Sequence, residues 1–112
     1  MEARAMANPH AGEVLLVIDR QPHVLKLTLG ALAALEAELG EDSLVALVER
    51  FEISRFSTRD VLALLVAGLR GGGWQGDAAD LGHAEIAGGP MGAARVAAQL
   101  LARAFTVPGE AG

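Results

Sequence analysis

The sequence contains no cysteine and no tyrosine, and its aromatic residues are one tryptophan and three phenylalanines among 112 residues. Without cysteine, disulfide bonds, thiol catalysis and zinc sites built from thiolates are excluded. The N-terminus has no apolar segment of the kind found in a signal peptide. The longest apolar run, residues 61–69, is too short to cross a bilayer. We therefore expect a soluble, cytoplasmic protein with no membrane partner.

Positive charge is also scarce, because nine Lys and Arg residues stand against 14 Asp and Glu residues, for a net charge of −5. A nucleic-acid-binding domain usually carries a basic stripe or patch. The nearest approach to a cluster here is Arg50, Arg55 and Arg59, and the acidic residues Glu52 and Asp60 lie among them. We predict that nucleic acid is not a partner.

No arrangement of residues indicates catalysis. His83 and Glu85 match half of a zinc deaminase signature, but the other half requires cysteines. The glycine runs 71–73 and 88–89 have neither nucleotide-binding pattern, and helix termination explains both. We expect a protein that is not an enzyme and has no cofactor and no metal site.

What the chain does have is apolar material, since 52% of its residues are hydrophobic. This is enough for the core of one domain. The β-branched run 13–19 and the alternating run 24–29 are separated by a short polar stretch, which predicts a β-hairpin. Because proline donates no hydrogen bond to a ladder, Pro22 is expected in the turn.

Helical patterns follow the hairpin. Their expected ranges are residues 28–39, 43–52, 57–70, 80–87 and 90–105. Ser57 and Asp60 have the spacing of a capping box, and Asp77 or Asp80 suits a helix N-cap. Helix 57–70 is apolar on nearly every side and should be the central one. That pattern also disfavours a helix-turn-helix, in which the second helix would present polar side chains to bases.

The predicted fold class is therefore α+β, with an N-terminal β-hairpin packed on a bundle of about four α-helices. The single domain is expected to span residues 12–106, between a flexible N-terminal segment, 1–11, and a flexible tail, 107–112. No heptad pattern or long free edge strand indicates an oligomer.

Without catalytic chemistry, surface complementarity to other proteins is the expected means of action. Trp74 lies in a glycine-flanked loop, where it either fills the core beneath the loop or anchors a partner. Tryptophan is enriched at interface hot spots. Trp74, Phe51 and Phe105 are the candidate partner-binding residues, and the last two lie on helices 43–52 and 90–105.

Five segments, taken in order, resemble the gene transfer agent family of small phage tail proteins. They are residues 6–14, 25–36, 56–64, 88–90 and 100–105. The resemblance covers roughly residues 6–106, and it is the ordered series that carries it. This sequence departs from the family at the turn between the strands, where a glycine is expected and residues 20–22 are Arg, Gln and Pro.

The resemblance implies a role in the tail of a phage-like particle, such as a gene transfer agent or a prophage. It implies either a tail assembly chaperone, which acts during virion morphogenesis by shielding the tape-measure protein, or a structural component of the tail or tail tube. The partners implied are the tail tape-measure protein and the tail tube protein. The family supplies no catalytic residues.

Overall fold

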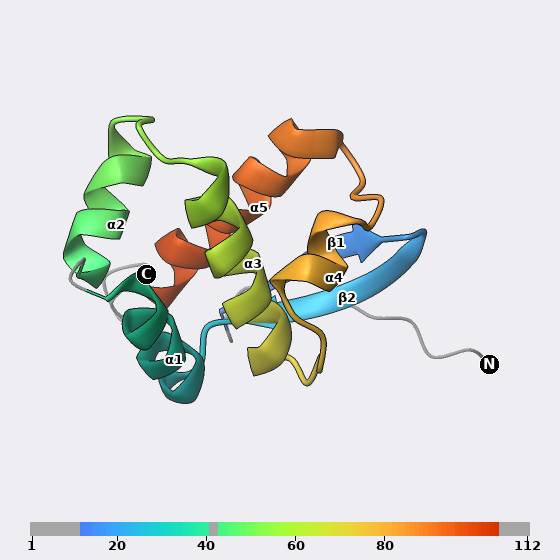
Figure 1. Cartoon of the computed structure of the whole chain (residues 1–112), viewed down its shortest axis with the longest axis horizontal. Coiled ribbons are helices and arrows are strands. Elements are labelled where there is room, and N and C mark those ends of the chain that lie inside the picture. Colours follow the sequence, from blue (N-terminus) through green and yellow to red (C-terminus); the bar gives the residue numbers. More distant parts are fainter. Residues whose placement is uncertain (1–11, 41–42, 106–112) are drawn as a thin grey trace, which may run out of the picture.

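The computed structural model describes residues 12–40 and 43–105, and within them a two-stranded hairpin is followed by five helices (Figure 1). In chain order the elements are β1 Glu13–Ile18, β2 Gln21–Lys26, α1 Leu29–Leu39, α2 Leu44–Glu52, α3 Thr58–Gly71, α4 Ala78–Gly82 and α5 Gly89–Ala104. The predicted α+β class is confirmed. The segments predicted to be flexible, 1–11 and 107–112, lie outside the described residues.

The hairpin turns at Asp19 and Arg20, whose φ angles are 50° and 68°. β1 and β2 are antiparallel, with Ile18 opposite Gln21 beside the turn. A two-residue turn with positive φ at both positions has the twist that suits a hairpin. The turn therefore forms without the expected glycine, since an aspartate and an arginine take the left-handed conformation instead.

The prediction that Pro22 belongs to the turn is wrong, because Pro22 lies in β2 opposite Val17. The pair next to a two-residue turn, Ile18 and Gln21, exchanges hydrogen bonds, and the following pair does not. Proline can occupy that second position because no N–H is needed toward β1. The second strand also ends at Lys26 rather than at residue 29.

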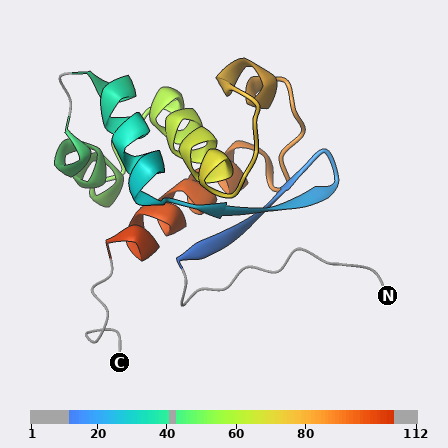
Figure 2. The ribbon, with the colours of Figure 1, turned by 90° about the horizontal axis from the view of Figure 1, so that it is seen from below.

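Other segments approach part of each edge of the hairpin (Figure 2). Along β1, Ile18 forms an isolated bridge with Ile86, and the Ala87 N–H donates to the Val17 carbonyl at 3.0 Å. Along β2, the end of α3 comes so close that a Cβ on Gly71 would lie 1.9 Å from the Lys26 carbonyl oxygen. The glycine run thus does more than end a helix, because it lets α3 reach the edge of the sheet.

Helices α1 and α2 each begin at a hydroxyl cap. The Thr28 hydroxyl accepts a hydrogen bond from the Ala31 N–H at 3.1 Å, and Ser43 does the same for Ala46 at 3.1 Å. α1 buries little more than Ala31 and Leu35. α2 lies at one end of the molecule, and Leu47 is its one buried residue (Figure 1).

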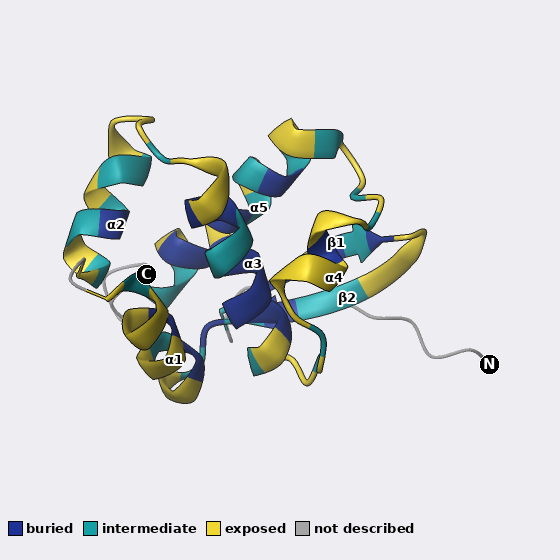
Figure 3. Ribbon diagram, viewed as in Figure 1, coloured by how far each residue is buried: buried dark blue, intermediate teal, exposed yellow. Residues whose placement is uncertain are grey.

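Helix α3 is the central helix, as predicted. It begins with the capping box of Ser57 and Asp60. It contacts β2, α1, α4 and α5, and most of its residues are buried (Figure 3). A helix that is apolar on most sides requires neighbours on most sides, and this arrangement supplies them.

The fourth helix is shorter than the predicted range 80–87. α4 begins after Asp77, whose carboxylate accepts a hydrogen bond from the Asp80 N–H at 3.0 Å, and it ends at Gly82. The chain then turns so that residues 85–87 bond to the edge of β1. Those backbone groups cannot also continue a helix. α5 follows, with Pro90 in its first turn.

The core lies between the inner face of the hairpin and the helices (Figure 3). Its largest fully buried side chains are Leu25, Leu35, Leu47, Leu64, Leu65, Leu69, Leu81 and Leu100. Alanines 93 and 97 bring α5 close to this cluster. The core rests on leucine from every helix and from the second strand, as expected for a chain with few aromatic residues.

Candidate interaction surfaces

A largely apolar groove runs between the N-terminal parts of α3 and α5, and Leu81 of α4 contributes to its lining. Its volume is about 500 Å³. We call it the apolar groove; among its lining residues are Phe56, Val61, Leu62, Leu65, Ile86 and Met91. Met91 is 73% exposed. A concave apolar surface of this size can receive the apolar side chains of a partner helix.

A second hollow, of about 530 Å³, lies where α1, α2 and the other side of α3 meet. We call it the polar hollow, because its lining includes Glu38, Arg50, Arg55, Arg59 and Asp60. Ser57 and Leu62 line both surfaces. The N-terminal half of α3 therefore forms the ridge between the apolar groove and the polar hollow.

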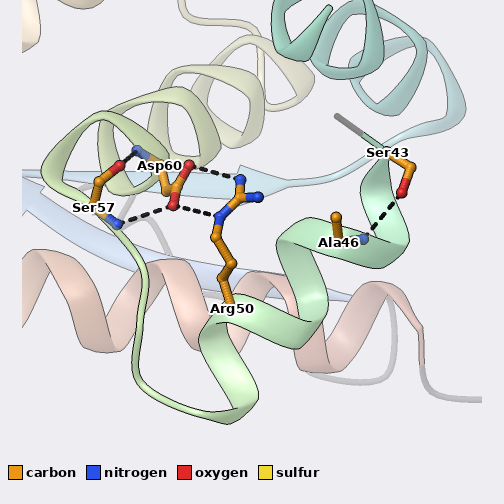
Figure 4. Close-up of polar contacts among 5 residues, drawn as sticks. All are labelled: Ser43, Ala46, Arg50, Ser57 and Asp60. Atoms are coloured by element: carbon orange, nitrogen blue, oxygen red, sulfur yellow. Dashed lines mark hydrogen bonds and ion pairs between the residues drawn. The ribbon is translucent and has the colours of Figure 1, made fainter. Parts of the chain in front are cut away.

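An ion pair between Arg50 and Asp60 ties α2 to α3 (Figure 4). The Arg50 guanidinium donates through Nε to Oδ2 and through Nη2 to Oδ1, both at 2.9 Å. The Asp60 carboxylate also accepts from the Ser57 N–H at 2.9 Å. The Asp60 side chain is only 11% exposed, so the pair is desolvated on its acidic side. Two parallel hydrogen bonds make this the strong form of the contact.

Burial alone would raise the pKa of Asp60, but the hydrogen bonds from Arg50 and Ser57 and the charge of Arg50 outweigh it, so the pKa is lowered. The pKa of Asp77 is also lowered, first by the hydrogen bond from the Asp80 N–H. Asp60 and Asp77 are therefore held in their charged form.

The three residues predicted to bind partners lie on separate elements. Phe51 is half-buried and stacks on Phe56, with ring centroids 4.4 Å apart and planes 9° from parallel. Phe105 follows α5 and is 49% exposed. Trp74 is half-buried against the core, and the space that a Cβ on Gly76 would need is taken by its indole. Trp74 therefore packs on the core, and part of its side chain remains exposed.

Phe51 and Trp74 do not belong to one surface. Phe51 packs on Phe56, just before α3 begins, whereas the Trp74 N–H bonds to the carbonyl of Leu69 at the end of α3. α3 has 14 residues, so its ends are about 20 Å apart. A single partner side chain could not contact both.

The sequence of this chain matches the model of a known protein family. The family described as "Phage tail tube protein, GTA-gp10" matches residues 11–107. The chain belongs to this family. The match confirms the resemblance, and it covers every element of the described fold. Neither a curated protein nor a solved structure matches the chain.

Two further observations on this phage tail family member concern metal ions and membranes. Residues 12–40 and 43–105 contain no group of three or more His, Asp or Glu side chains placed to hold a metal ion. Within the same residues, no helix has the length and apolar character needed to span a membrane.

The residues of the apolar groove were not predicted from the sequence, although one of its walls, α5, corresponds to predicted helix 90–105, where the candidate residue Phe105 was placed. Its lining comes from residues far apart in the chain, such as Phe56, Ile86 and Met91. The sequence of helix 57–70 did contain an indication of the groove. This helix has more apolar positions than the neighbouring elements cover. Leu62 is left half-buried on that helix.

The lowered pKa of Asp60 predicts that this tail protein loses stability in acid. The folded state holds the proton less tightly than the unfolded chain, so the stabilisation is complete above about pH 4. It is lost as the pH falls through the lowered pKa of the folded state. Urea unfolding at a series of acidic pH values measures this dependence. In Asp60→Asn the unfolding free energy should depend clearly less on pH in this acidic range. If it falls with pH as it does in the wild type, the assignment to Asp60 is contradicted.

Proposed function

We propose that this phage tail protein is a tail assembly chaperone that binds an amphipathic helix of the tape-measure protein in the apolar groove. The observation that carries the proposal is the groove itself. It is lined by apolar side chains from α3, α4 and α5, and it has Met91, 73% exposed, at one side. An exposed apolar surface of this kind on a small protein is typical of an interaction site and supports the proposal.

The physical need for such a chaperone follows from the partner. A tape-measure protein is long and helical, and its apolar contact surfaces are exposed before the tube assembles around it. Exposed apolar surface in an incompletely assembled protein favours aggregation. A small acidic protein, with a net charge of −5, can cover those surfaces in several copies and keep the complex soluble.

The hairpin supports a chaperone rather than a tube subunit. Polymerisation through a β-sheet uses an unpaired strand edge. Here β1 is bridged by residues 85–87, and β2 is approached closely by Gly71 and Gly72. Within the described residues these contacts occupy part of each strand edge, which hinders the addition of a strand from a second subunit.

The second candidate is a structural component of the tail, and the family description, which names a tail tube protein, favours it. The two proposals differ in where the chain is found. A chaperone is released before the particle is complete, whereas a tube component remains. Detecting the chain in purified mature particles, in amounts comparable with other tail proteins, would favour the structural role.

Co-expression with the tape-measure protein tests the chaperone proposal. We expect the wild-type chain to co-purify with it and to keep it in the soluble fraction. Met91→Glu places a charge on the exposed side of the groove and should weaken binding by about 10-fold or more. Ala94→Arg, which fills the groove from α5, should do the same.

Ala98→Arg is the matched control for Ala94→Arg. Ala98 lies one turn further along α5 and is exposed, and it does not line the groove. Circular dichroism checks that each variant is folded, and Met91, being mostly exposed, is the safer substitution. If the tape-measure protein is equally soluble without the wild-type chain, or if both groove variants bind as well as Ala98→Arg, the proposal is wrong.

A further inference from the structure

We infer that the helix bound in the apolar groove carries acidic side chains along one edge, and that Arg55 and Arg59 bind that edge. The inference rests on the proposed function and defines the chemistry of the partner. It starts from the position of the two arginines, which line the polar hollow on the other side of the α3 ridge.

The three arginines of the polar hollow are not equivalent. Arg50 is committed to Asp60 through two hydrogen bonds. Arg55 and Arg59 are exposed, and neither forms an ion pair with any carboxylate in residues 12–40 or 43–105. The remaining acidic residue in the lining is Glu38 of α1. This hollow therefore keeps positive charge available on a protein whose net charge is −5.

The positive charge lies within reach of a helix in the groove. Arg59 precedes Leu62 by three residues on α3, so the two side chains are neighbours on one face of the helix. Leu62 lines both the apolar groove and the polar hollow, and it is half-buried on the ridge between them. A helix seated against Leu62 from the groove side presents one of its edges to Arg59. The same edge, extended toward the start of α3, reaches Arg55.

The partner that fits is an amphipathic helix with apolar residues at a spacing of three and four and with Asp or Glu beside them on one side. A basic edge would be repelled by Arg55 and Arg59, and a neutral edge would leave them unused. Charge complementarity at the rim of an interface sets orientation and association rate more than affinity. The arginines therefore specify which way round the helix lies, while the groove supplies most of the binding.

Overlapping synthetic peptides that span the tape-measure protein, titrated against the full chain by fluorescence anisotropy, test this inference. We expect the peptides that bind to have an acidic edge beside an apolar stripe, and their binding to weaken as salt is added. Arg55→Glu combined with Arg59→Glu should weaken binding by about 10-fold at low salt, because two attractions become repulsions. At high salt the difference from the wild type should largely disappear.

Arg59→Glu and Arg20→Glu form a matched pair of single charge reversals. Arg20 is exposed in the hairpin turn. The turn between β1 and β2 lies at the opposite end of the molecule from α2 (Figure 1). We expect Arg59→Glu to weaken binding and Arg20→Glu to leave it within about twofold of the wild type, because distant exposed charges are screened.

The outcomes separate the two proposals. If Met91→Glu abolishes binding while the double arginine variant binds as the wild type does, the arginine edge is wrong and the chaperone proposal stands. Binding of peptides with a basic edge, or binding that does not change with salt, also overturns the inference. If no tape-measure peptide binds the wild-type chain, both proposals fail.

Discussion

Replacing Gly71 with alanine should destabilise the protein by about 3 kcal/mol, the upper range for inserting a methyl group into a packed site. The new Cβ would lie 1.9 Å from the Lys26 carbonyl oxygen, and the obstacle is backbone, which cannot rotate away as a side chain can. Helix propensity alone predicts the opposite sign, because alanine is favoured over glycine inside a helix. Thermal unfolding should show the melting temperature lowered by more than about 10 °C.

Gly82→Ala is the control for this substitution. Gly82 ends α4, its φ is not in the left-handed region, and a Cβ there would meet nothing within 4 Å. Alanine should be neutral at Gly82 or stabilise the fold by about 0.5 kcal/mol. If Gly71→Ala and Gly82→Ala have the same small effect, the end of α3 does not press on the sheet edge as the structure indicates.

The helices could be predicted from the sequence because each begins with a local signal. The capping box of Ser57 and Asp60 and the cap at Asp77 depend on residues three apart. The central position of α3 follows from its composition, since an apolar helix needs cover on most sides. These features require no knowledge of the rest of the chain.

Most of the features that the sequence did not predict depend on contacts between segments that are distant in the chain. The place of Pro22 in β2 is set by the register of the hairpin, and the register follows from a turn whose left-handed residues are not glycine. The shortness of α4 is set by the bonds of residues 85–87 to β1. The apolar groove arises only when α5 returns past the start of α3. Local pattern contains none of this information.

Replacing Asp60 with alanine should cost about 2 kcal/mol of unfolding free energy, less than for a fully buried ion pair because Arg50 remains 26% exposed. The substitution removes the carboxylate that accepts two hydrogen bonds from Arg50 and one from Ser57. α2 has one fully buried residue, Leu47, and its other apolar side chains are only partly buried against the core, so the ion pair adds a specific contact that holds α2 to α3. Urea unfolding measures the total loss. Hydrogen exchange should show the α2 amides losing more protection than those of α3.

Asp80→Ala separates the ion pair from the cap. Asp80 has the same position in the Asp77 capping box that Asp60 has in the Ser57 box, and its carboxylate accepts from the Asp77 N–H at 3.0 Å. It has no arginine partner within the described residues. The loss of unfolding free energy for Asp80→Ala should be less than half of the loss for Asp60→Ala, because Asp80→Ala removes only the contribution of a helix cap. Equal losses would mean that Arg50 contributes nothing, and that α2 is held by Leu47 and by the stacking of Phe51 on Phe56. In that case the hydrogen exchange of α2 would not respond to Asp60→Ala.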